Sequence, residues 1–198
     1  MSQRVNAQTG STQRLNSLRL KRCTAKQKGM TFIEVLIALV IMVTGILGAV
    51  AMQATAKKGS FDAMQRSLAS SLAQDIVERM RGNDSSTLAL YTANSPYGSG
   101  KITSSPTCNS AAALCTPAQM VTHDLFGWEQ SLMGAGATNG DNNVGGLVGG
   151  VGCLSLIGNA VTVVITWQGR SELVDGSTEG CGGTGNQRRQ VRVEAFVF

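Results

Sequence analysis

The chain has 198 residues, of which 17 are Lys or Arg and 12 are Asp or Glu, and its formal net charge is +5. Seven of the basic residues and none of the acidic ones precede Met30, so residues 30–198 carry ten basic and 12 acidic side chains and a net charge of −2. This distribution excludes a basic folded domain of the kind that binds nucleic acid, and the length suits one domain with an additional N-terminal segment.

Residues 1–29 form a basic leader that is rich in Gln, Ser, Asn, Arg and Lys and shows no apolar periodicity. We expect this segment to be disordered, because it has too few apolar residues to bury. Its positive charge directly before an apolar run predicts that it lies on the cytoplasmic side of a membrane. Cys23 lies within it, apart from the other four cysteines.

An apolar run follows Gly29, and no charged residue occurs in it from Val35 to Ala56. About 20 apolar residues are enough to cross the ~30 Å hydrocarbon core of a bilayer as one helix. The sequence therefore predicts a single membrane-spanning helix over residues 30–56. A secretory signal peptide would have a shorter apolar region and a small-residue cleavage site after it. A simple membrane anchor remains the alternative.

Glu34 is the one charged residue inside this apolar block. An acid in a membrane helix is costly, so it is a functional residue by default and needs a cationic partner. Cleavage after Gly29 would create such a cation, the α-amino group of Met30. Within one helix this amine lies about 6 Å from Glu34 along the axis. Between staggered parallel helices the two groups can meet, so Glu34 is predicted to dock one helix on another.

Gly29, Met30 and Glu34 together resemble the class III signal of type IV pilins and of type II secretion pseudopilins. The resemblance implies that a prepilin peptidase cuts between Gly29 and Met30, and that Met30 is then N-methylated. It also implies an intersubunit ion pair between Glu34 and the N-terminus of a neighbouring subunit. The family usually has Phe at the position of Met30.

One continuous helix is predicted over residues 30–82, with Gly45 and Gly48 as weak points and Gly82-Asn83 as its end. Its second half is amphipathic. The predicted buried stripe comprises Phe61, Met64, Leu68, Leu72, Ile76 and Met80. Asp62–Arg66 and Asp75–Arg79 have the i,i+4 spacing of surface ion pairs. Residues 77–81 resemble the end of this helix in PilV-type minor pilins.

Residues 83–107 are predicted to be a loop. A helix is predicted over residues 117–133, because Thr116, Pro117 and Gln119 have the spacing of a capping box with proline at the first helical position. Its Asp124, Leu125, Trp128 and Leu132 resemble the second helix of PilV-type pilins. The glycine-rich residues 134–152 are predicted to be a flexible loop. They lack a phosphate-binding motif, and Asp141-x-Asn143-x-Gly145 lacks the downstream acid of a calcium loop.

Three antiparallel strands are predicted over residues 153–157, 160–168 and 190–198, with Gly158-Asn159 as a hairpin turn. The last strand alternates, with Val191, Val193, Ala195 and Val197 on one face. A three-stranded sheet with one apolar face needs a cover, which the amphipathic half of the long helix supplies. The expected fold is therefore α+β, a long N-terminal helix packed on a small antiparallel sheet, as the pilin resemblance also implies.

Four cysteines follow the predicted membrane span, where an oxidising periplasm allows disulfides. Of the three pairings that four cysteines allow, Cys108–Cys115 and Cys153–Cys181 are favoured. A zinc site would require closer paired spacing, so no metal or cofactor is expected. His123, the only histidine, is expected to be a surface or partly packed residue, because no catalytic partner shares its helix face.

The complete interpretation is a PilV-type minor pilin that is a structural and assembly subunit of a type IV pilus, with a role in pilus initiation, assembly or tip function, rather than an enzyme. The predicted parts are a cleaved leader over 1–29, a transmembrane and filament-core helix over 30–56, and a periplasmic head over 57–198. Its partners would be the prepilin peptidase, other minor and major pilins, the inner membrane and the pilus assembly machinery, with no nucleic acid. Alternatives are a type II secretion minor pseudopilin and an enzyme or sensor domain on a single-pass anchor.

Overall fold

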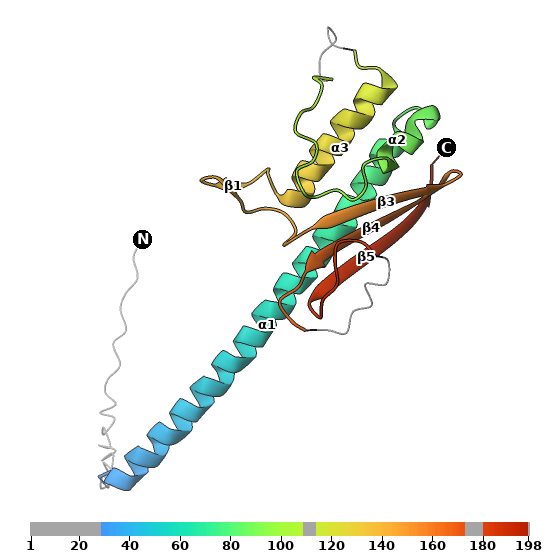
Figure 1. Ribbon diagram of the computed structural model, residues 1–198. Coiled ribbons are helices and arrows are strands. Elements are labelled where there is room, and N and C mark those ends of the chain that lie inside the picture. Colours follow the sequence, from blue (N-terminus) through green and yellow to red (C-terminus); the bar gives the residue numbers. More distant parts are fainter. Residues whose placement is uncertain (1–28, 109–113, 173–179, 198) are drawn as a thin grey trace, which may run out of the picture. The chain divides into compact units, whose positions relative to one another are not determined.

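The computed structural model describes residues 29–108, 114–172 and 180–197 (Figure 1). Cys23 and the rest of residues 1–28 lie outside the described residues. The chain divides into two units, Met1–Ile46 and Leu47–Phe198. Helix α1, Phe32–Arg81, contributes to both units. It begins two residues after the predicted start and ends one residue before the predicted end. No proline interrupts it, and Gly45 and Gly48 stay helical.

The core of the second unit is built on the last three turns of α1. Leu72, Ile76 and Met80 from the predicted stripe are buried, together with Ala69, Ala73 and Val77. The first part of the stripe was predicted wrongly, because Phe61 is half-exposed and Met64 is 57% exposed. The sheet and α3 cover α1 only from about residue 65 onward, so the earlier apolar residues of the stripe lie outside the core.

A short helical region replaces the loop predicted after α1. A 3₁₀ turn, η1, spans Ser85–Thr87, and helix α2 spans Leu88–Thr92. The Asp84 side chain caps this region by accepting a hydrogen bond of 2.8 Å from the backbone N–H of Ser86. Leu88 and Tyr91, three residues apart, are both buried. The loop prediction was therefore wrong for residues 85–92, where a capped turn starts a short helix that buries two residues, and correct for residues 93–107.

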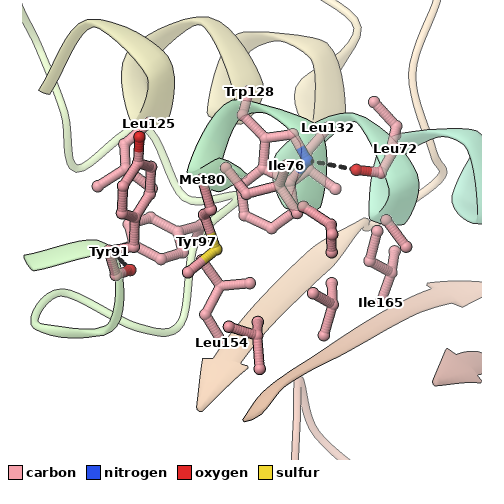
Figure 2. Packing of buried hydrophobic residues seen from close by; sticks show 14 of the residues in the cluster. Leu72, Ile76, Met80, Tyr91, Tyr97, Leu125, Trp128, Leu132, Leu154 and Ile165 are labelled. Carbon is pink, nitrogen blue, oxygen red and sulfur yellow. Dashed lines mark hydrogen bonds between the residues drawn. The ribbon is translucent and has the colours of Figure 1, made fainter. Parts of the chain in front are cut away.

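Helix α3, Pro117–Met133, has the predicted bounds and the predicted capping box. The Thr116 hydroxyl accepts from the backbone N–H of Gln119, and the Gln119 side chain accepts from the backbone N–H of Thr116. Gly134 ends the helix in the left-handed conformation with φ of 74°, which glycine adopts without strain. Figure 2 shows Trp128 and Leu132 of α3 packed with Leu72 and Ile76 of α1.

The main sheet contains three antiparallel strands in the order β3-β4-β5. They span Val151–Ile157, Ala160–Gln168 and Arg188–Phe196, close to the predicted ranges. Gly158, with φ of 60°, and Asn159 form the predicted hairpin turn. Odd-numbered residues of β4 face the core, which contains Val161, Val163, Ile165 and Trp167. The α+β fold is confirmed, with α1 packed against this sheet.

A second, small hairpin lies in the glycine-rich region that was predicted as a flexible loop. Strands β1, Thr138–Asn139, and β2, Asn142–Asn143, pair antiparallel and are exposed. Gly140, with φ of 61°, lies in the turn between them. The hairpin has no apolar face, so the periodicity used to predict strands carried no signal here.

Candidate functional site

The predicted cleavage junction lies immediately before α1. Gly29 and Met30 are exposed and outside the helix, and 70% of Met30 is accessible. A Cβ on Gly29 would meet nothing within 4 Å. The described residues therefore leave this peptide bond open to a second molecule.

Glu34 lies in the first turn of α1, where its backbone N–H donates to the carbonyl oxygen of Thr31 at 3.0 Å. Thr31 and Glu34 have the Thr-x-x-Glu spacing of a capping box, a signal that the sequence analysis did not use. Among the described residues, neither side chain forms a hydrogen bond or ion pair. An acid in the first turn is stabilised by the partial positive charge of the helix N-terminus, and this carboxylate remains available to a partner on another chain.

The apolar residues after Glu34 are exposed along the whole first half of α1. Within the part of the chain that the structure describes, α1 is the one helix long and apolar enough to cross a membrane, and its apolar window contains no buried residue. The side chains of Phe32, Ile41 and Leu47, for example, are 80%, 66% and 63% exposed. A surface of this size requires lipid or other helices to cover it.

Two family models match adjacent segments of the chain. Residues 24–50 match the model of the prokaryotic N-terminal methylation motif, and residues 51–126 match the model described as type IV pilin Tt1218. The matched segments are therefore similar to an N-terminal methylation motif and to a type IV pilin, respectively. No curated protein and no solved structure matches the chain. Gly29, Met30 and Glu34 all lie within the segment that matches the methylation motif.

Arg79, near the end of α1, meets Asp124 of α3 in a polar network. The guanidinium of Arg79 donates to Asp75 at 2.9 Å and to Asp124 at 3.4 Å. The Tyr91 hydroxyl donates to the other oxygen of Asp124 at 2.6 Å. Burial works to lower the pKa of Arg79, but the hydrogen bonds and charges of Asp75 and Asp124 raise it overall. Burial raises the pKa of Tyr91 strongly, and its hydrogen bond to Asp124 raises it further. The network joins α1, α2 and α3.

Glu129 is a fully buried carboxylate that the sequence analysis did not single out. Its two oxygens accept hydrogen bonds of 2.9–3.3 Å from five consecutive backbone N–H groups, those of residues 98–102. Burial works to raise the pKa of Glu129, but these donors, that of Ile102 first, lower it overall. One side chain of α3 thus holds a five-residue loop without any cation.

Asp62 holds a different loop against α1. Its carboxylate accepts from the backbone N–H of Arg170 at 3.0 Å and from the Ser171 hydroxyl at 2.6 Å, and it lies 3.7 Å from the Arg189 guanidinium. The predicted Asp62–Arg66 pair was therefore wrong. The predicted Asp75–Arg79 pair is present at 2.9 Å.

The structure forms the two favoured disulfides, Cys108–Cys115 and Cys153–Cys181. These four thiols are therefore unavailable to the zinc site considered as an alternative. Within the described ranges, no three His, Cys, Asp or Glu side chains gather as metal ligands. His123 is partly buried, and its Nδ1 lies 2.9 Å from Ser105 Oγ and 3.1 Å from the carbonyl oxygen of Pro106. This ring links α3 to the preceding loop.

Proposed function

We propose that this chain is a PilV-type minor pilin, a structural and assembly subunit of a type IV pilus. Prepilin peptidase removes residues 1–29, residues 30–56 anchor the subunit in the inner membrane, and residues 57–198 form a periplasmic head. The mature subunit then enters the pilus through its N-terminal helix and acts in initiation, assembly or at the tip. The finer assignment to minor pilins rests on the resemblance of residues 77–81 and 124–132.

The observation that carries this proposal is the unpaired Glu34 carboxylate on an uncovered apolar helix, inside a methylation motif. A charge in an apolar surface is stabilised when an opposite charge meets it at the same depth. The ammonium of Met30 from a neighbouring subunit supplies that charge. The same contact also aligns the apolar surfaces of the two helices, which bury each other in the filament.

Mass spectrometry of the mature protein tests the proposal directly. The expected N-terminus is Met30 carrying one methyl group on its nitrogen. A mature chain that begins at Met1 or Ser2 would refute both cleavage and the pilin function, and would favour a domain on a simple anchor. Immunogold labelling of sheared pili then tests whether the processed chain is part of the filament.

A further inference from the structure

A groove of about 590 Å³ lies between α1 and the loop that follows the small hairpin. Its volume is in the range of small-molecule sites. Its lining is mostly apolar and contains no acidic residue: Phe61, Met64, Gln65, Leu68, Val144, Gly145, Gly146, Val148 and Arg170. The Gln65 side chain holds the two walls of the groove together, because its Oε1 accepts a hydrogen bond of 3.0 Å from the backbone N–H of Val148.

One cation, Arg170, lines this groove, and a second, Lys57, lies one helical turn before it on α1. The Arg170 guanidinium lies 4.1 Å from the centre of the Phe61 ring. The nearby Asp62 carboxylate already accepts two hydrogen bonds and faces Arg189, so Arg170 has no ion pair among the described residues. Lys57 is exposed and lies four residues before Phe61, on the same face of α1.

The groove begins where the chain leaves the predicted membrane span. The uncharged run ends at Ala56, and Phe61 follows about 7 Å further along the helix axis. Lys57 therefore lies at the depth of the lipid headgroups, where basic side chains are attracted to anionic lipids. The Arg170 side chain, stacked on Phe61, adds a second charge beside the same apolar surface.

A neighbouring helix is a less suitable occupant. The corresponding apolar segment of a second copy, Val35 to Ala56, contains no charge. It would cover the apolar wall but leave Lys57 and Arg170 without a counter-ion. A lipid that combines a phosphate with an acyl chain satisfies both parts of the groove.

We propose that this groove binds an anionic phospholipid of the membrane, with the phosphate between Lys57 and Arg170 and the start of an acyl chain against Phe61, Met64 and Leu68. The inference rests on the membrane anchoring in the proposed function, and it requires neither cleavage nor filament assembly. The bound lipid fixes the head at the membrane surface before the subunit is extracted.

The test uses the full chain in nanodiscs of phosphatidylcholine, with or without phosphatidylglycerol. Native mass spectrometry counts the retained lipids, and a photo-crosslinking residue at Met64 identifies the neighbour. We expect the wild type to retain phosphatidylglycerol preferentially. Lys57→Gln and Arg170→Gln should each reduce that retention about five-fold, and Met64→Glu should reduce it as well. The matched controls Lys101→Gln and Leu90→Glu, both exposed and outside the groove, should leave it unchanged.

Equal retention of the two lipids, an unchanged Arg170→Gln variant, or equal losses in the controls would overturn the proposal. A cross-link from position 64 to a second chain rather than to lipid would assign the groove to a neighbouring helix and also overturn it. A chain that does not enter nanodiscs contradicts the membrane anchor, and with it the lipid site. A chain that enters without lipid preference contradicts only the lipid site.

Discussion

The indole Nε1 of Trp128 donates a hydrogen bond of 2.8 Å to the carbonyl oxygen of Leu72 (Figure 2). This bond joins α3 to the buried face of α1 in the middle of the core. The Trp128 ring also packs so close to β3 that Gly152 has no room for a side chain, because a Cβ there would lie 2.4 Å from the ring. One side chain thus determines how closely the helix layer approaches β3.

Two substitutions of Trp128 should lower the free energy of unfolding of the head by different amounts. Trp128→Phe removes the hydrogen bond and part of the ring, and should cost about 1–2 kcal/mol of unfolding free energy. Trp128→Ala should cost about 3–5 kcal/mol, because it leaves a large cavity. Urea unfolding of the full chain in detergent, followed by Trp167 fluorescence, measures both. Ser131→Ala, at an exposed position of α3, is the control and should change little. Equal stability of Trp128→Ala and the control would contradict this role.

Glu129 should make the loop of residues 98–102 sensitive to acid. Its folded-state pKa lies below the ordinary value, so its stabilisation is complete above the unfolded-state pKa of about 4.3 and is lost as the pH falls through the lower folded-state pKa. Hydrogen exchange of these five amides, relative to intrinsic rates, should accelerate in that acid range.

The variant Glu129→Gln should expose the same amides at neutral pH. It removes the charge that accepts five N–H donors, and we expect a loss of about 1–3 kcal/mol. Glu78→Gln, which alters an exposed pair with Arg81, is the matched control. If the loop amides of Glu129→Gln stay as protected as those of the control, the carboxylate does not hold the loop.

Gly29→Ala should block processing, because a methyl group at this position interferes with recognition by the peptidase. We expect the uncut precursor to accumulate in the membrane fraction, detected by its larger mass on immunoblots. Gly45→Ala, in the apolar half of α1, is the control and should be cut normally. Normal cleavage of Gly29→Ala would count against the junction.

Glu34→Gln should be cleaved but should enter pili poorly. The amide keeps the size of the side chain and loses the charge that meets a neighbouring ammonium. The measurement is the content of this subunit in sheared pili and the number of pili per cell. Glu34→Asp, which keeps the charge, should restore part of the content. Pili unchanged in number and composition would refute the docking role.

The two disulfides should differ in their contribution to stability. Loop-closure entropy gives about 3.5 kcal/mol for Cys153–Cys181 and about 2.5 kcal/mol for Cys108–Cys115, because the first closes the longer loop. Paired Cys→Ser variants compared by thermal unfolding measure this difference. A larger loss from the Cys108–Cys115 variant would contradict the ranking.

The regular elements were predictable because their signals are local. The capping box at Thr116 fixed the start of α3, and β-branched residues with a Gly158-Asn159 turn fixed the hairpin of the main sheet. The buried stripe of α1 was only partly predictable. Periodicity shows which face of a helix is apolar, but Met64 is exposed because the layers above the helix end before it. The point along α1 at which the covering layers end depends on the tertiary structure, which periodicity does not encode.

The buried polar groups were harder to predict. Asp124 and Glu129 lie on the same face of α3 as Leu125, Trp128 and Leu132, and acids inside an apolar stripe were the available signal. Their partners come from α1, α2 and the loop before α3, which no local pattern indicates. Gly29, Met30 and Glu34 were predicted from the sequence as the N-terminal site, and the partners proposed for them belong to other molecules.

Helix α1 is synthesised before β3, β4 and β5, the strands that pack on its buried face. The helix leaves the ribosome long before the strands that cover it, so its buried face has no packing partners until those strands are made. During that interval Ala69, Ile76 and Met80, which are fully buried in the folded chain, are accessible to chaperones and proteases. The buried face of α1 therefore becomes protected only when the C-terminal strands have formed the sheet.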